Sequence, residues 1–169
     1  MTSTRPEVWL RGPLADIPSL LQPVAHSLLQ CAEEVRATLP RLDEAELRLN
    51  PGNAATAEYH LRHAINSLDR LFTYARGQQL SETQLAALKA ESAPGTESSN
   101  ELVAAFDQAV ERALQQLRAT SESTLLEVRH VGRARLPSTV IGLLFHAAEH
   151  TQRHVGQLVT TARIVRHRA

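Results

Sequence analysis

The chain has 169 residues, which suits one domain with a complete hydrophobic core, because chains divide into several domains mostly above about 250 residues. Its 18 basic and 18 acidic side chains cancel, so no overall field would attract nucleic acid or an anionic membrane. The sequence contains neither a recognisable leader peptide nor an apolar run of about eighteen residues, and its single cysteine, Cys31, cannot form an internal disulfide. We therefore expect one soluble, cytoplasmic domain over residues 1–169, with a core from about 9 to 166 and without nucleic acid or membrane partners.

Apolar residues recur at helical spacing in the first half of the chain and predict two long helices. The first runs from about Pro18 to Leu39 and is followed by a connection over residues 41–53. The second ends near Gly77, which is placed as a C-terminal cap. A Ser-x-x-Gln capping box then predicts a short extra helix from Ser81 to about Glu91, packed across one end of the bundle.

The second half of the chain predicts two more long helices. Residues 92–100 are the most loop-like stretch, and the third helix after them should end near Thr120. Residues 121–136 lack a helical period and predict an irregular excursion, which ends at Pro137-Ser138, the start of a fourth helix that reaches about Arg166. Together these elements predict an all-α protein, a four-helix bundle.

The fourth helix carries three histidines at intervals of four residues, His146, His150 and His154. Each such step advances a helical side chain by only about 40°, so His150 and His154 lie one turn apart on one face and could bind one cation together. The spacing fits ordinary solvated or hydrogen-bonded histidines at least as well.

A third ligand should come from another helix, because bundles build metal sites from side chains that project inward from facing helices. The candidates are His60 and His63 on the second helix, of which only one need bind. His63 lies nearer the middle of its helix, whereas His60, beside Tyr59 near the helix start, fits a structural role better. Three nitrogen ligands would leave coordination positions open for water or substrate, as in catalytic zinc sites.

Three passages of the sequence resemble the DinB-like superfamily of bacterial four-helix proteins. They are Glu-Tyr-His-Leu-Arg-His at 58–63 with residues 67–71 and 74–77, the segment 131–137, and residues 146–158 with their His-Val-Gly-Gln ending. The resemblance implies a DinB-like bundle in which the second and third helices run parallel. It also implies metal ligands at His63, His150 and His154.

The resemblance implies a metal-dependent enzyme, either a thiol S-transferase or a hydrolase, because an open divalent cation activates a bound low-molecular-weight thiol or water. Zinc or nickel is expected, and iron or manganese would also fit; the partner would be a small-molecule substrate. His60 and His146 are candidate rim residues, and Glu149 and Gln157 could orient the ligand imidazoles.

Further expectations concern the surface of the protein. Arg129, Arg133 and Arg135 in the excursion could bind an anionic group of a cofactor, although basic loops are usually solvated surface. Apolar positions outside the predicted stripes, such as Leu14, Leu88 and Val165, suggest a homodimer. The alternative to an enzyme is a noncatalytic bundle that binds a small ligand and retains the histidine site.

Overall fold

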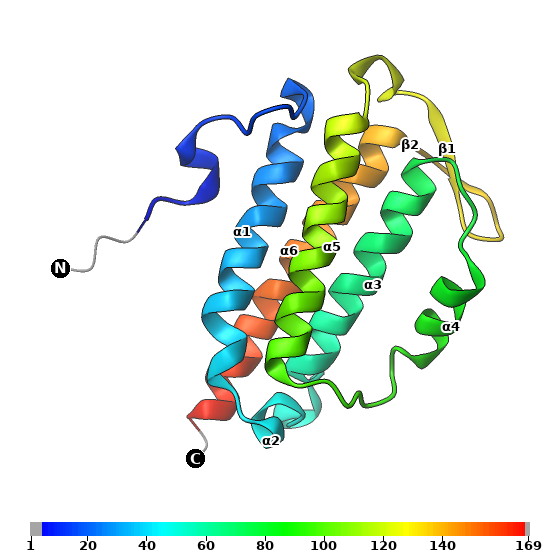
Figure 1. The fold of residues 1–169 in the computed structure, drawn as a ribbon. Coiled ribbons are helices and arrows are strands. Elements are labelled where there is room, and N and C mark those ends of the chain that lie inside the picture. The colour runs from blue at the N-terminus through cyan, green and yellow to red at the C-terminus, as the bar shows by residue number, and fades with distance from the viewer. Residues whose placement is uncertain (1–4, 168–169) are drawn as a thin grey trace.

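Four long helices dominate the structure, a computed structural model that describes residues 5–167 (Figure 1). They are α1 (Gln22–Thr38), α3 (Ala57–Ala75), α5 (Ser99–Ala119) and α6 (Val140–Arg166). The connections contain the short helices α2 (Glu44–Leu47) and α4 (Glu82–Ala90) and the strands β1 (Val128–Val131) and β2 (Leu136–Thr139). Short 3-10 turns lie at Val8–Arg11, Ser19–Leu21, Leu39–Arg41, Pro51–Asn53 and Glu122–Thr124. The predicted all-α four-helix bundle with a short extra helix is confirmed, and a small hairpin is added to it.

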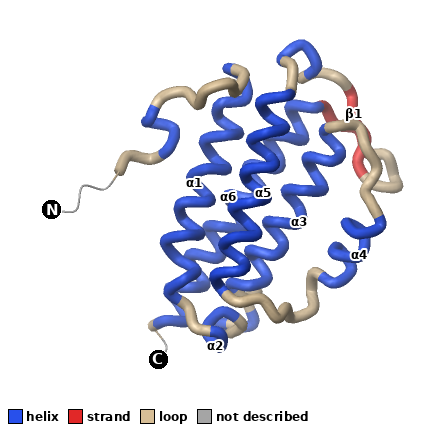
Figure 2. The backbone as a smooth tube through the Cα atoms, in the orientation of Figure 1, coloured by secondary structure: helices blue, strands red, loops and turns tan. Residues whose placement is uncertain are grey.

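The helices α3 and α5 run in the same direction, because the chain between them returns along the outside of the bundle before α5 begins (Figures 1 and 2). The helices α1 and α6 run the opposite way (Figure 1). This is the connectivity that the resemblance to the DinB-like superfamily implies.

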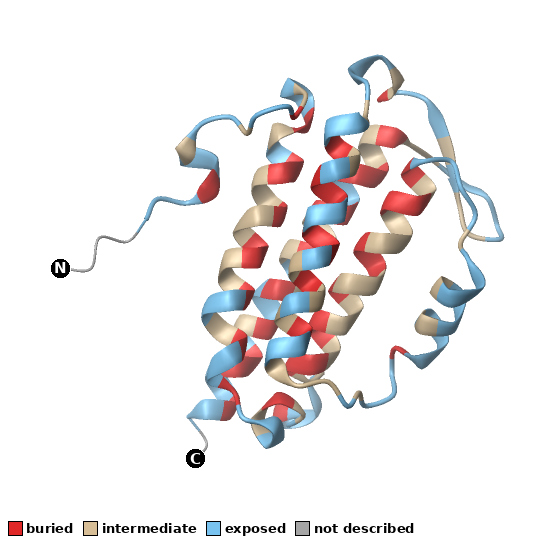
Figure 3. Ribbon diagram, viewed as in Figure 1, coloured by how far each residue is buried: buried red, intermediate tan, exposed pale blue. Residues whose placement is uncertain are grey.

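The core lies between the four long helices, whose buried positions face one another (Figure 3). The closest pairing is that of α3 with α6, in which Leu61, Leu68, Val155 and Leu158 are almost completely buried. These two helices carry the candidate ligand histidines, so their packing sets the geometry of the site. Within residues 5–167, no helix combines the length and the apolar character needed to cross a bilayer.

Local signals in the sequence set both ends of the α3–α4 connection. The N–H of Gly77 donates to the carbonyl of Tyr74 at 2.8 Å, and Gly77 has a φ of 75°, which glycine adopts without strain. The hydroxyl of Ser81 accepts from the N–H of Gln84 at 3.1 Å, and the Gln84 side chain accepts from the N–H of Ser81 at 2.9 Å. The predicted cap and capping box are both confirmed.

The helix α4 lies along the side of α3, and its predicted position across one end of the bundle is wrong. The amide of Gln84 donates to the carboxylate of Asp69 at 2.6 Å and to the hydroxyl of Thr73 at 2.8 Å. No residue of α4 is buried, and its leucines Leu85 and Leu88 are exposed, so this helix does not cover a bundle end. Its polar contacts instead fix it to the outer face of α3.

The helix α6 begins at Val140, two residues later than the predicted start at Pro137-Ser138. Pro137 belongs to β2, where it pairs with His130 of β1. Thr139 caps the helix, since its hydroxyl accepts from the N–H of Gly142 at 3.1 Å. The extended backbone of this pairing therefore displaces the helix start by part of a turn.

Two further differences lie near the N-terminal half. The first long helix starts at Gln22, because residues 19–21 form a 3-10 turn. The predicted connection over residues 41–53 contains α2, which Asp43 caps by accepting from the N–H of Glu46 at 2.8 Å. The Asp-x-x-Glu spacing of that capping box was present in the sequence but was not used in the prediction.

The apolar residues that suggested a dimer are mostly inside the protein. Val165 is only 2% exposed, and Leu14 packs against the core. Of the three, only Leu88 is exposed, at 44%. Val165 and Leu14 therefore contribute to the packing within one chain, and only Leu88 is available to a partner.

Candidate metal centre

Three histidines from α3 and α6 meet at one point of the bundle. The ligand-type nitrogens of His63, His150 and His154 all lie within 4.8 Å of one another. His63 Nε2 is 2.8 Å from His150 Nε2, and the His63 and His154 ring centroids are 4.3 Å apart. In a tetrahedral site with metal–nitrogen distances of about 2.0–2.1 Å, neighbouring nitrogens are about 3.3 Å apart. Small changes in side-chain angle would therefore suffice for all three to bind one cation.

The local structure explains why these side chains converge. His150 and His154 are one turn apart on α6, and their ring centroids are 4.6 Å apart. His63 reaches the same level from α3, which packs antiparallel to α6 (Figure 1). All three are partly buried, so the site lies at the edge of the core, where a small molecule could approach.

A buried carboxylate fixes the orientation of His63. Glu91, at the end of α4, is 7% exposed, and its Oε2 lies 2.8 Å from His63 Nδ1. The guanidinium of Arg70 donates to Oε1 of the same carboxylate at 2.9 Å. Because a carboxylate only accepts, Nδ1 of His63 carries the proton and Nε2 presents its lone pair towards His150. This carboxylate–histidine arrangement is typical of metal ligands.

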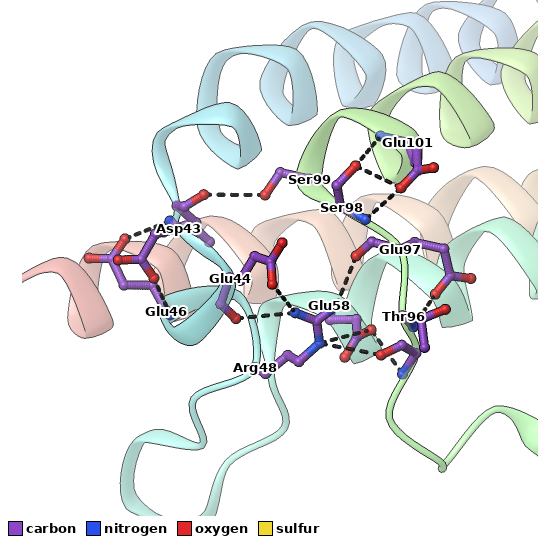
Figure 4. Close-up of polar contacts among 12 residues, drawn as sticks. Asp43, Glu44, Glu46, Arg48, Glu58, Thr96, Glu97, Ser98, Ser99 and Glu101 are labelled. Carbon is purple, nitrogen blue, oxygen red and sulfur yellow. Dashed lines mark hydrogen bonds and ion pairs between the residues drawn. The ribbon is translucent and has the colours of Figure 1, made fainter.

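The segment after Glu91 is held in place by a network of polar contacts (Figure 4). The N–H of Gly95 donates to the buried carboxylate of Glu58 at 2.9 Å, and Arg48 donates to the carbonyl of Glu97, also at 2.9 Å. Arg62 donates to the carbonyl of Ala93 at 2.6 Å. These contacts tie the segment to α2 and α3 and thereby hold Glu91 beside His63.

His60 contacts the second ligand on α6. Its Nδ1 is 3.1 Å from Nδ1 of His154, so one of the two rings donates a hydrogen bond to the other. His60 is 7% exposed. The ring of Tyr59 stacks on His63, with centroids 5.8 Å apart and an interplanar angle of 16°. Glu91 therefore supports His63, and His60 supports His154. His150 has no comparable neighbour among the described residues.

The electrostatics of the site favour neutral imidazoles. Burial and the neighbouring His63 lower the pKa of His60 and of His150. Burial, together with the nearby histidines and Arg153, lowers the pKa of His154 to about 4. Coordination requires an unprotonated nitrogen, so these rings are in the state that a cation needs at neutral pH. Burial alone would raise the pKa of Glu91, but hydrogen bonds from Arg70 and His63 hold that pKa below its usual value.

The other predicted residues of this region lie at its rim. His146 is about half exposed, and its ring centroid is 5.4 Å from that of His150. Glu149 forms an ion pair with Arg153, so its carboxylate is engaged on the outer face of α6. Gln157 is exposed, one turn beyond His154. Nδ1 of His150 is buried and has no hydrogen-bond partner within residues 5–167, so neither Glu149 nor Gln157 fixes its tautomer.

The arginines of the excursion lie far from the histidines. Arg129 donates to the carbonyl of Ala75 at 2.9 Å and to the carboxylate of Glu127 at 2.9 Å. Ala75 is twelve residues beyond His63 on α3, which corresponds to about 18 Å along the helix. Arg135 contacts His130 within the hairpin at 3.3 Å. The structure therefore does not bring Arg129, Arg133 and Arg135 to the histidine cluster.

Glu91 and Arg70 are the residues of the site that the sequence analysis missed. Arg70 follows His63 by seven residues and so lies on the same face of α3, which is a usable signal for Arg70. Glu91 is 28 residues from His63 and reaches it only because α4 folds back along α3. No spacing rule indicates such a contact.

The comparisons with known proteins agree with this architecture. A sequence model described as the DinB superfamily matches residues 27–158. The chain therefore belongs to the DinB superfamily, as its histidine-bearing passages predict. Among solved structures it is similar to a conserved protein of Enterococcus faecalis, with 18% identity and a TM-score of 0.66, over 86% of this chain and 96% of that chain. A likeness at that identity shows a shared fold. The search of curated proteins found no match.

Proposed function

We propose that this member of the DinB superfamily is a metal-dependent enzyme in which His63, His150 and His154 bind one divalent cation. The observation that carries the proposal is the convergence of their nitrogens within 4.8 Å, with one ring held by a buried carboxylate. An imidazole donor set suits zinc and nickel best, and iron or manganese are further candidates. Three protein ligands leave coordination positions for an exogenous molecule.

Neighbouring side chains would prepare two of the ligands. Glu91 accepts the Nδ1 proton of His63, so Nε2 is the nitrogen that faces the cation. His154 would bind through Nε2 and donate its Nδ1 proton to His60, whose Nδ1 lies 3.1 Å away. His60 is thereby assigned a supporting role, and His63 is the ligand from α3.

An open divalent cation lowers the pKa of a bound thiol or water and so favours its attack on an electrophile. The function proposed is therefore transfer of a low-molecular-weight thiol to a small organic substrate, or hydrolysis of such a substrate. The partial burial of the three histidines supports this, because it limits the water that competes at the site.

The test is turnover. Protein purified without a histidine tag and loaded with zinc or nickel is assayed for conjugation of monochlorobimane with bacillithiol, mycothiol and glutathione, and for hydrolysis of small esters. We expect metal-dependent turnover with at least one of these, and its loss in His63→Ala. If fully loaded protein is inactive with every thiol and ester, a noncatalytic bundle that binds a small ligand becomes the better description.

We also propose that the protein is a cytoplasmic homodimer. Phe145 on α6 is 64% exposed and Leu126 before the hairpin is 80% exposed, and a dimer interface would remove these large apolar side chains from water. Light scattering at micromolar concentration should give twice the chain mass of 18.6 kDa. A mass near 18.6 kDa would contradict the dimer and leave the metal site unaffected.

A further inference from the structure

An elongated groove of about 570 Å³ runs along α6 beside the metal centre. One wall is the face of α6 that begins at Arg153 and continues to Ile164, and the other wall is formed by Pro51, Ala54 and Ala55. Its volume falls within the range of about 300–1,000 Å³ that is typical of small-molecule sites.

The groove begins next to a proposed metal ligand. His60 lines one end of it, and Nδ1 of the same ring is 3.1 Å from Nδ1 of His154. Gly156 and Gln157, which also line the groove, follow His154 by two and three residues on α6. None of the three candidate ligands lines the groove, so a molecule in it would contact His60 on the outer side of His154 and not the cation itself.

The residues that line the groove disfavour binding of a charged molecule. Arg153 is the one formally charged residue of the lining, and its guanidinium forms an ion pair with Glu149. A charged ligand would thus find no uncompensated partner, and its desolvation would oppose binding. One end offers the hydrogen-bonding groups of His60 and Gln157. Along the rest, Pro51 and Ile164 provide apolar surface, and two threonines also contribute, of which Thr160 donates its hydroxyl to the carbonyl of Gly156.

We propose that this groove binds a small uncharged organic molecule, with a carbonyl-type polar end at His60 and Gln157 and an apolar chain along α6. This ligand site goes beyond the proposed metal centre, so the groove and its ligand class can be tested without turnover.

Gly156 offers a direct way to block the groove. A Cβ added at Gly156 would have no heavy atom within 4 Å, apart from the helix's own nearby backbone, so a side chain there would extend into the groove. Any residue other than glycine or proline also favours the helical conformation relative to glycine. Gly156→Phe should therefore fill the groove without destabilising the bundle, and Gly156→Ala serves as the matched control with the groove left open.

The experiment is a titration of the zinc-loaded protein with hexanamide, followed by amide chemical shifts in nuclear magnetic resonance. We expect saturable shifts at residues 156–164, a dissociation constant at least tenfold higher for Gly156→Phe, and a change of less than twofold for Gly156→Ala. Hexanoate, which has the same chain length and a charge, should bind at least tenfold more weakly than hexanamide.

Three results would overturn the inference: no saturable shift, equal affinity of wild type and Gly156→Phe, or shifts confined to the separate cavity lined by Tyr59 and Arg62. Metal content is measured on the same samples. Bound zinc without hexanamide binding would reject the groove and leave the proposed function standing. Hexanamide binding to protein that retains no zinc would reject the metal site and leave the groove as a ligand site.

Discussion

Oε2 of Glu91, the residue directly after α4, lies 2.8 Å from Nδ1 of His63 on α3, although the two residues are 28 positions apart. An ionised carboxylate can only accept a hydrogen bond, so Nδ1 of His63 carries the proton. Nε2 is therefore the nitrogen of His63 that is available to a cation. Arg70 holds the carboxylate from its other oxygen at 2.9 Å. The short helix α4 therefore contributes to the histidine site without supplying a ligand.

Removing this carboxylate should weaken metal binding. Loss of such a partner typically lowers metal affinity by about 10–100-fold, so the zinc affinity of Glu91→Ala should be lower than that of wild type by about this factor. Glu91→Gln keeps an oxygen that can accept from His63 and should lose less. Competition with a chromophoric chelator measures the affinities, and exposed Glu82→Gln on the same helix is the control. Wild-type affinity in a folded Glu91→Ala protein would show that Glu91 does not support the site.

The two histidines of α3 should respond differently to substitution. His63→Ala removes a ligand and should abolish stoichiometric zinc binding. His60→Ala should retain one zinc per chain with affinity reduced by about tenfold, because His60 contacts only the outer nitrogen of His154. Elemental analysis after desalting and circular dichroism separate metal loss from unfolding. Complete loss of metal in His60→Ala, with metal kept in His63→Ala, would reverse these assignments.

The metal-free protein should become less stable as the pH falls from 7.5 to 5. The folded-state pKa of His154 is about 4, below the value of about 6.5 for an unfolded histidine, so the unfolded state binds more protons between these two values. His60 and His150 shift in the same direction. Staying above pH 5 keeps most carboxylates ionised.

Denaturant unfolding at pH 7.5, 6.5, 5.5 and 5.0 measures this effect. His154→Gln should reduce the loss of unfolding free energy across the range, since it removes the group with the largest resolved shift among the histidines. A wild-type free energy of unfolding that stays constant over the range would contradict the environment described for these rings.

Two glycines should respond oppositely to alanine. A Cβ on Gly95 would lie 2.6 Å from Oε1 of Glu58 and against the carboxylate of Glu97. Gly95→Ala should displace both carboxylates and destabilise the protein by about 0.5–1.5 kcal/mol, the net value of the hydrogen bond from Gly95 to Glu58. A Cβ on Gly156 would have no heavy atom within 4 Å apart from the nearby backbone of α6. Because alanine favours the helix relative to glycine, Gly156→Ala should stabilise the protein by up to about 1 kcal/mol. Thermal unfolding compares the two variants. Equal stability of Gly95→Ala and wild type would show that the segment after Glu91 yields without cost.

Local and periodic features of the fold could be predicted from the sequence. The helical spacing of apolar residues located the four long helices, and Gly77 and Ser81 were correctly predicted as a cap and a capping box. The extended pairing of Pro137 with His130 could not be predicted by these means, because strand pairing depends on a partner elsewhere in the chain. The side on which α4 packs was missed for the same reason.

The site shows the same division between local and long-range information. The four-residue spacing of His150 and His154 is visible in the sequence, and family resemblance indicated His63. The contact of Glu91 with His63 depends on how α4 returns along α3, and the engagement of Glu149 with Arg153 depends on which way that side chain turns. No spacing along one helix encodes the first contact, whereas Glu149 and Arg153 are four residues apart on α6, a spacing that favours an ion pair.

The most direct test of the central claim is the zinc content of untagged protein after equilibration with excess zinc and desalting. Wild type should retain one zinc per chain, and the His150→Ala, His154→Ala double variant should retain none while keeping its helical circular dichroism. At a hundredfold excess over the dissociation constant, zinc should also stabilise wild type by about 2.7 kcal/mol. Equal zinc content in the two proteins would show that the cation binds elsewhere and would contradict a metal centre at these histidines.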